Sequence, residues 1–349
     1  MNPSCSGSGQ IWGVVPSLAL VTWLGVGAFR RYARHRGLVD RPGARSSHSV
    51  PTPTGGGLVM VLSFVGGLVW LWWAECLPAG LATGLGAGAG VLGGMGYLDD
   101  RHDISSLWRL LVQFAVVLSF LYWIPGMTGW DRFDPPGWVV RLGVVIGWVW
   151  LINLYNFMDG IDGLAASQAV FVAAGAAAIL VLKGSSPVVP VLCVLAAVAA
   201  GFLPWNWPPA KIFMGDAGSG FLGFSLGALA VTTIHSGELT LWSWIILLGV
   251  FVVDATLTLL VRLFEGQRWY AGHRSHAYQQ AARRWGGHRP VSLVAIAINL
   301  LWLWPMAWYA SNRQELGVIL SLISLVPLTG IAWGLGAGAV ENSRDMKKL

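Results

Sequence analysis

Apolar segments long enough to cross a bilayer recur along the whole chain, and this feature limits the fold more than any other. Weakly charged runs of about 17 to 23 residues are typical of membrane-spanning helices. Eleven can be placed, beginning near residues 11, 56, 79, 107, 137, 163, 187, 218, 241, 291 and 316. Because backbone polar groups must be satisfied inside a bilayer, the sequence predicts an all-α polytopic helical bundle of about eleven transmembrane helices, with residues 1–349 as one integral-membrane domain.

The composition supports a membrane protein. Apolar residues make up 55% of the chain and charged residues 11%, and the mean hydropathy is +0.62. A soluble domain usually has about a quarter charged residues. The first ten residues have no basic segment, so the first apolar run reads as an uncleaved span rather than a signal peptide.

Lysine and arginine are distributed unevenly between the two predicted sides. Eighteen of the 22 basic residues fall on the side of the C-terminus, six of them in the loop after the first span. Because basic loops stay in the cytoplasm, the N-terminus is predicted to be periplasmic and the C-terminus cytoplasmic, in a multi-pass protein of the inner (cytoplasmic) membrane. The net charge of +6 then reflects basic cytoplasmic loops and does not imply a nucleic-acid partner.

The unusual polar segments all fall on the predicted cytoplasmic side, at residues 41–57, 98–105, 153–163, 211–220 and 271–279. In the second of them, Asp99, Asp100 and Asp103 lie within five residues. On a helix Asp103 would share a face with either of the other two. Like charges there repel unless a cation or a proton joins them. The alternative is an acidic loop exposed to water.

The third segment places Asn153 and Asn156 one helical turn apart, followed by Asp159 and Asp162 in a glycine-containing loop. Asn and Asp oxygens suit a hard cation such as Mg²⁺. Asp162 could instead cap the following helix. The fourth segment adds Asp216, followed by glycines that let backbone approach a ligand closely.

The last segment supplies His273, Arg274 and His276, which together could hold phosphate oxygens. Zinc is the competing interpretation, but two histidines at this spacing without thiolates make a poor zinc site. The glycines of residues 53–57 indicate either a tight turn before a span or backbone that cradles a ligand. Asp254 lies inside the ninth predicted span, where pairing with Arg262 or another basic residue is at least as good an explanation as catalysis.

Taken together, these segments resemble the polyprenyl-phosphate N-acetylhexosamine-1-phosphate transferases of glycosyltransferase family 4, over almost the whole chain. The peptidoglycan branch typically has lysine where this chain has Asp103, and three histidines where it reads His273, Arg274, Ser275, His276. LDDRHDIS, RSSHSVPTPTGGG and GHRSHAYQ look more like the O-antigen-initiating branch. The resemblance implies transfer of a sugar 1-phosphate from UDP-linked N-acetylglucosamine, N-acetylfucosamine or N-acetylquinovosamine to undecaprenyl phosphate, with release of UMP.

The resemblance also implies roles for individual residues. The catalytic positions are Asp99, Asp100 and Asp216, and the metal ligands are Asn156 and Asp216, for Mg²⁺ or alternatively Mn²⁺. The implied substrate-binding positions are Arg45, His48, Asn153, Asp159, Asp162, Lys211, His273, Arg274 and His276. A homodimer is compatible with this family.

Two other classes compete with this interpretation. A ubiquinone-type prenyltransferase also uses acidic motifs and magnesium in a helical bundle, but it needs two similar Asp-rich motifs, whereas the second acidic segment here begins with asparagine. A lipid or nucleotide-sugar transporter would carry polar residues along its spans. Here Asp254 is almost the only acid deep in a span.

Overall fold

The computed structural model describes residues 9–42, 50–123, 137–267 and 273–339, and it confirms an all-α polytopic bundle. The helices are α1 (Gly9–His35), α2 (Gly57–Trp73), α3 (Ala79–His102), α4 (Ser106–Trp123), α5 (Gly137–Met158), α6 (Leu164–Leu182), α7 (Val189–Asn206), α8 (Gly215–His235), α9 (Leu241–Leu247), α10 (Gly249–Phe264), α11 (Ala277–Arg284), α12 (His288–Ile298), α13 (Trp304–Asn312) and α14 (Gly317–Gly334). A π-helical turn, Asn299–Leu303, joins α12 to α13, and a 3₁₀ turn, Gln314–Leu316, precedes α14.

Each of the eleven predicted segments is helical, although not every one is long enough to span a bilayer alone. Within the described ranges, eight helices are long and apolar enough to cross a membrane. The pair α9 and α10 is bent by 79° and makes a ninth span if counted as one. The helices Gly57–Trp73 and Ser106–Tyr122 are apolar but shorter. The count of eleven spans and the orientation in the membrane stay predictions.

Helix α8 lies inside the bundle and is buried along most of its length. Helices α3 and α5 pack along it. Helix α3 approaches closely because it is rich in glycine: a Cβ atom at Gly96 would collide with the backbone of Asp216 and Ala217. Small residues permit such approaches between helices in membranes, where packing drives association. The contact sets the end of α3, with its acidic residues, against the first turn of α8.

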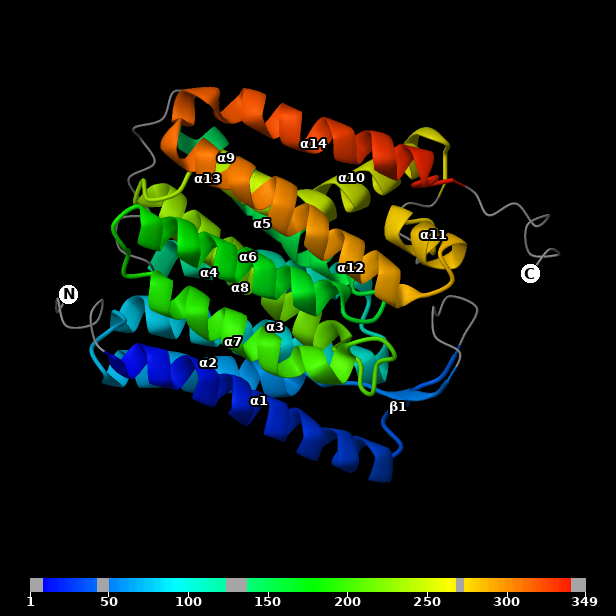
Figure 1. Ribbon diagram of the computed structural model, residues 1–349. Helices are drawn as coiled ribbons and strands as arrows, with labels where there is room; N and C mark the ends of the chain where they lie inside the picture. Colours follow the sequence, from blue (N-terminus) through cyan, green and yellow to red (C-terminus); the bar gives the residue numbers. More distant parts are fainter. Residues whose placement is uncertain (1–8, 43–49, 124–136, 268–272, 340–349) are drawn as a thin grey trace.

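The polar elements gather at one end of the bundle (Figure 1). Helix α1 begins at one end and α14 ends at the opposite end, where α11 and the start of α12 also lie. At that same end, β1 (Val39–Asp40) pairs antiparallel with β2 (Thr52–Pro53), with Val39 opposite Pro53. This short hairpin carries the segment after α1 toward the end of α3 and the start of α8.

Candidate active site

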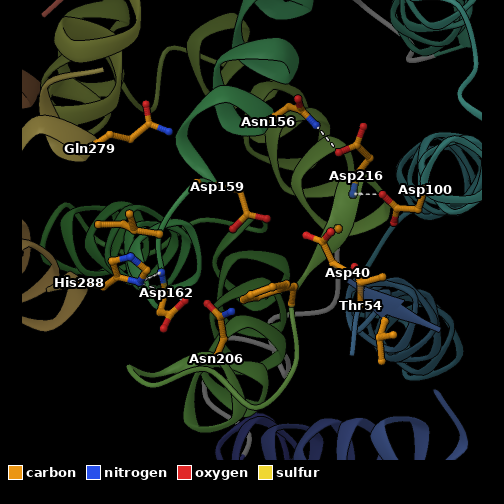
Figure 2. Close-up of a pocket in the computed structure, with 15 residues that line it drawn as sticks. Asp40, Thr54, Asp100, Asn156, Asp159, Asp162, Asn206, Asp216, Gln279 and His288 are labelled. Atoms are coloured by element: carbon orange, nitrogen blue, oxygen red, sulfur yellow. Dashed lines mark hydrogen bonds and ion pairs between the residues drawn. The ribbon is translucent and has the colours of Figure 1, made fainter. Parts of the chain in front are cut away.

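A polar cavity of about 470 Å³ opens among these elements. Its lining comes from β1, the residue after β2, the ends of α3, α5 and α7, the loops before α6 and α8, the starts of α8 and α12, and α11. The lining residues are Val39, Asp40, Thr54, Asp100, Asn156, Asp159, Gly160, Ile161, Asp162, Asn206, Phe213, Gly215, Asp216, Gln279 and His288. Figure 2 shows Asp40, Asp100 and Asp216 on one side, Asp162 and His288 on the other, and Asp159 between them.

The acidic side of the cavity is built around the first turn of α8. The backbone N–H of Asp216 donates to Asp100 Oδ1 at 3.2 Å, which satisfies one of the free N–H groups at the helix start. Asn156 Nδ2 donates to Asp216 Oδ1 at 2.7 Å and lies 3.3 Å from Ser219 Oγ. Three segments that are far apart in the sequence therefore meet at Asp216.

Arg109 of α4 is the basic residue that joins two of these acids. Its Nη1 lies 2.7 Å from Asp99 Oδ2 and 3.2 Å from Asp216 Oδ2. Because the guanidinium is positively charged and contacts both carboxylates, it offsets the electrostatic repulsion between them. Sequence reasoning missed this role and used Arg109 only as one of the basic residues that orient the chain. Its position one turn into an otherwise apolar helix was the available signal.

Asp99 lies behind the cavity and is not one of its lining residues. Its side chain is 8% exposed, and its other oxygen, Oδ1, accepts the backbone N–H of Ile104 at 2.7 Å. Asp99 therefore contacts Arg109 and the turn after α3. Asp100, the next residue, faces the cavity instead.

Asp159 lies in the loop between α5 and α6, half-buried in the cavity wall. Burial raises its pKa well above the ordinary value, and the charges of Asp216, Asp100 and Asp162 raise it further. A carboxyl group in this setting favours either a proton or a nearby cation.

The donor set fits a hard divalent cation such as Mg²⁺. Carboxylate oxygens of Asp100, Asp159 and Asp216 and the amide of Asn156 face one cavity. No group of three or more His, Cys, Asp or Glu side chains in the described part of the chain is placed to hold a metal ion by itself. Mg²⁺ does not require one, because it commonly takes one or two carboxylates together with phosphate oxygens and water.

The opposite side of the cavity is held by Asp162. Its Oδ2 accepts the backbone N–H of Ala210 at 2.9 Å, and its Oδ1 lies 3.2 Å from His288 Nδ1. Asp162 does not cap α6, contrary to one of the two interpretations of the sequence, because Gly163 occupies the cap position without a side-chain bond. Asn206 accepts the N–H of Gly163 at 2.9 Å and so ties this loop to the end of α7.

Several residues predicted for substrate binding lie away from the cavity lining. His276 is 2% exposed and faces Asp254, and His273 stacks on it with ring centroids 4.8 Å apart. Burial, together with the charges of His276 and Arg262, lowers the pKa of His273 to about 3, so this imidazole is neutral at pH 7. A role of these histidines in binding phosphate stays a prediction.

Arg274, Asn153 and Lys211 are also absent from the lining. The Arg274 carbonyl accepts from Arg283, Asn153 is paired with Gln113, and Lys211 lies 5.7 Å from the Trp205 ring. Arg45 and His48 lie outside the described residues. The functional roles assigned to all these residues stay predictions.

Two local expectations from the sequence are decided by the backbone. Asp103 does not share a helix face with Asp99 or Asp100, because α3 ends at His102 and Asp103 takes a left-handed conformation with φ of 46°. The glycines of residues 53–57 form a packed turn: the N–H groups of Gly56 and Gly57 donate to the carbonyls of Phe213 and Met214. Packing therefore explains these two N–H groups, whereas Thr54 of the same stretch lines the cavity, so a ligand-binding role of the stretch stays a prediction.

Asp40, Thr54, Gln279 and His288 were not singled out in the sequence, although they line the cavity. Asp40 and Thr54 arrive through the β1–β2 hairpin, which hydrophobic patterning does not reveal. Gln279 belongs to α11, which begins inside the polar segment 271–279, and His288 is the first residue of α12. In that segment, roles were assigned from the sequence to the histidines and Arg274, and not to Gln279.

Residues 82–234 match the family described as Glycosyl transferase family 4. The chain is 31% identical to a probable undecaprenyl-phosphate N-acetylglucosaminyl 1-phosphate transferase of Bacillus subtilis, over 78% of this chain and 77% of that protein. It is 29% identical to a decaprenyl-phosphate N-acetylglucosaminephosphotransferase of Mycobacterium tuberculosis, over 89% and 87% respectively. It is also 33% identical to a phospho-N-acetylmuramoyl-pentapeptide-transferase of a Synechococcus species, over 70% of each chain.

Proposed function

Because the chain belongs to the polyprenyl-phosphate N-acetylhexosamine-1-phosphate transferases of glycosyl transferase family 4, we propose that it transfers N-acetylhexosamine 1-phosphate from a UDP-sugar to undecaprenyl phosphate. The observation that carries the proposal is the convergence of Asp100, Asn156, Asp159 and Asp216 on one polar cavity at the end of a membrane bundle. The names of the relatives support a GlcNAc-type sugar and a polyprenyl phosphate acceptor. Initiation of O-antigen or a related envelope polysaccharide is the role proposed from the motifs.

In the proposed reaction, an oxygen of the acceptor phosphate attacks the donor phosphorus that bears the sugar. A P–O bond to the acceptor forms, the bond between the two donor phosphates breaks, and the bridging oxygen leaves with UMP. The sugar phosphate remains on the lipid as a diphosphate. The products balance without any redox partner.

Asp216, Asn156 and Asp100 would hold Mg²⁺ in this site. When bound, the cation would neutralise charge that develops on the departing UMP. Asn156 keeps Asp216 in place through its 2.7 Å hydrogen bond, and the Asp216 N–H orients Asp100. Arg109 holds Asp99 and Asp216 together from the side. Positioning of charged groups supplies most of the catalysis in phosphoryl transfer.

The test is UMP release by the purified full-length protein, incubated with undecaprenyl phosphate and Mg²⁺. Donors should include UDP-N-acetylglucosamine, UDP-N-acetylfucosamine, UDP-N-acetylquinovosamine and UDP-N-acetylmuramoyl pentapeptide. We expect release with one of the first three and none when a chelator removes the cation. Release of UMP with the muramoyl donor alone would contradict the proposed identity of the sugar. No release with any donor would contradict the proposed function.

The cavity is proposed to face the cytoplasm, following the distribution of basic residues. A cytoplasmic reporter fused after Leu349 should then be active and a periplasmic reporter inactive. The reverse pattern would put the cavity on the wrong side for this function.

A further inference from the structure

Asp254 is a buried acid that the proposed mechanism does not use. It lies in α10, is 5% exposed, and is not among the residues that line the polar cavity. An acid inside a membrane-spanning segment is unfavourable unless other groups satisfy it, and such acids usually have a function. Its partners show what that function is.

The Asp254 carboxylate receives donors from the start of α11. Oδ1 accepts the backbone N–H of Ala277 at 2.9 Å, and Oδ2 accepts the N–H of Tyr278 at 2.8 Å. His276 Nδ1 lies 3.2 Å from Oδ1, and Thr258 Oγ1 donates to the same oxygen at 3.2 Å. A carboxylate is a favourable partner for the free N–H groups of a first helical turn. Asp254 therefore anchors α11 to α10.

Helix α11 in turn contacts the segment that carries the acidic residues of the cavity. The Tyr278 hydroxyl donates to the carbonyl of Phe157 at 2.9 Å, one of the free carbonyls at the end of α5. Phe157 lies between Asn156 and Asp159 in sequence. A Cβ atom at Gly160 would collide with the Tyr278 hydroxyl, so only glycine permits this approach. Gln279, the next residue of α11, lines the cavity itself.

We propose that Asp254 is a positioning residue for the active site, which acts through α11 and Tyr278 to hold residues 156–163 in place. The path has two steps, each made of hydrogen bonds: from the carboxylate to the start of α11, and from Tyr278 to the end of α5. Asn156 and Asp159 are on the segment at the end of this path. If the path is weakened, the segment becomes more mobile and the two residues bind a cation less tightly. This consequence rests on the proposed function, whereas the structural link does not.

Two substitutions test the two steps. Asp254→Asn replaces one carboxylate oxygen with a donor that faces backbone donors, and Tyr278→Phe removes only the hydroxyl that bonds to Phe157. Tyr155→Phe is a matched control, because the Tyr155 hydroxyl is buried and has no hydrogen-bond partner in the described part of the chain. If Asp254→Asn fails to fold, Tyr278→Phe still tests the second step.

Hydrogen–deuterium exchange of the full-length protein measures the link without any substrate. We expect faster exchange across residues 156–163 in Asp254→Asn and in Tyr278→Phe, and wild-type exchange in Tyr155→Phe, because a lost anchor raises local opening. Unchanged exchange across this segment in both test variants would overturn the proposal.

The second measurement is UMP release as a function of Mg²⁺ concentration. We expect the half-saturating concentration to rise about tenfold in both test variants, since partners that orient metal ligands typically change affinity by about 10- to 100-fold. Much of the rate should return at saturating Mg²⁺. A rate lowered by the same factor at every Mg²⁺ concentration would indicate a merely structural role and overturn the proposal. If the wild-type protein releases no UMP with any donor, the proposed function fails, and the exchange measurement alone decides the role of Asp254.

Discussion

Asp254 and the acids of the cavity are both removed from bulk water to some degree, yet hydrogen bonds satisfy them to very different extents. Asp254 has two backbone N–H donors, a threonine hydroxyl and a histidine around one carboxylate. Asp100, Asp159 and Asp216 face a shared cavity, where burial, and then the charges of Asp216, Asp100 and Asp162, raise the pKa of Asp159. An acid with a full set of donors stabilises the fold, whereas a group of acids that repel one another favours a proton or a cation.

The largest expected effect is the loss of Asp216. Asp216→Ala removes the carboxylate at which Asn156, Asp100 and Arg109 meet, so UMP release and its Mg²⁺ dependence should both be lost. Folding should survive, because the side chain faces a cavity rather than the packed core. A purified variant that keeps more than about a tenth of wild-type activity has lost under about 1.4 kcal/mol of transition-state stabilisation. That result would exclude Asp216 as a metal ligand.

Asp99 should act by position and charge rather than as a base. A phosphate monoester has its second pKa near about 6, so most of the acceptor has already lost its proton at about pH 7 to 8. Asp99 contacts Arg109 and Ile104 instead of the cavity. We expect Asp99→Asn to lower the rate at least about tenfold by the same factor from about pH 6 to 9. A rate that returns to wild type at alkaline pH would identify Asp99 as the base.

Arg109 should reduce the repulsion between Asp99 and Asp216 when no divalent cation is bound. Arg109→Met keeps an unbranched apolar side chain but removes the charge between Asp99 and Asp216. We therefore expect a lower melting temperature without Mg²⁺ and a larger increase on adding Mg²⁺ than in the wild type. Arg313→Met is the control, because Arg313 forms an exposed pair with Glu315 at 3.9 Å. Equal Mg²⁺-induced shifts in the wild type and Arg109→Met would contradict this role.

Hydrophobic length alone predicts most of the fold, since α5, α6 and α8 appear in the sequence as long apolar runs. The polar side chains of the cavity were also predictable, because Asp100, Asn156 and Asp216 lie in polar segments at the ends of apolar runs, here α3, α5 and α8. The helices and the polar residues at their ends can both be predicted because they depend only on the local composition of the sequence.

The partners of those acids could not be read from the sequence. Arg109 meets Asp216 only because α4 and α8 pack near the same end of α3, and His276 faces Asp254 only because the start of α11 packs against α10. Asp103 shows a similar limit, because the helix ends one residue too early for it to share the face of Asp99. Spacing along the chain reports neither tertiary partners nor the residue at which a helix ends.

The smallest expected effect is also the most direct test of the difference between the two acidic sites. The same change of aspartate to asparagine should alter the melting temperature in opposite directions. Asp254→Asn removes an acceptor from the start of α11 and should lower it. Asp159→Asn removes a charge that its surroundings disfavour, so without a cation it should raise the melting temperature by a few degrees while lowering activity.

The increase in stability expected for Asp159→Asn depends on pH, and the direction of the Asp159 pKa shift predicts how. A carboxyl group whose folded-state pKa is raised loses stability as pH rises from about 3.9, the unfolded value, to the raised value. Asparagine does not titrate, so the gain should be full above this window and should shrink as pH falls toward about 4. Added Mg²⁺ should also reduce it, because a bound cation relieves the same repulsion in the wild type. Thermal unfolding at several pH values, with and without Mg²⁺, measures the gain at high pH, its decrease at low pH and its decrease with Mg²⁺. A loss of stability in Asp159→Asn at neutral pH would show that Asp159, like Asp254, is a satisfied acid that holds the fold together.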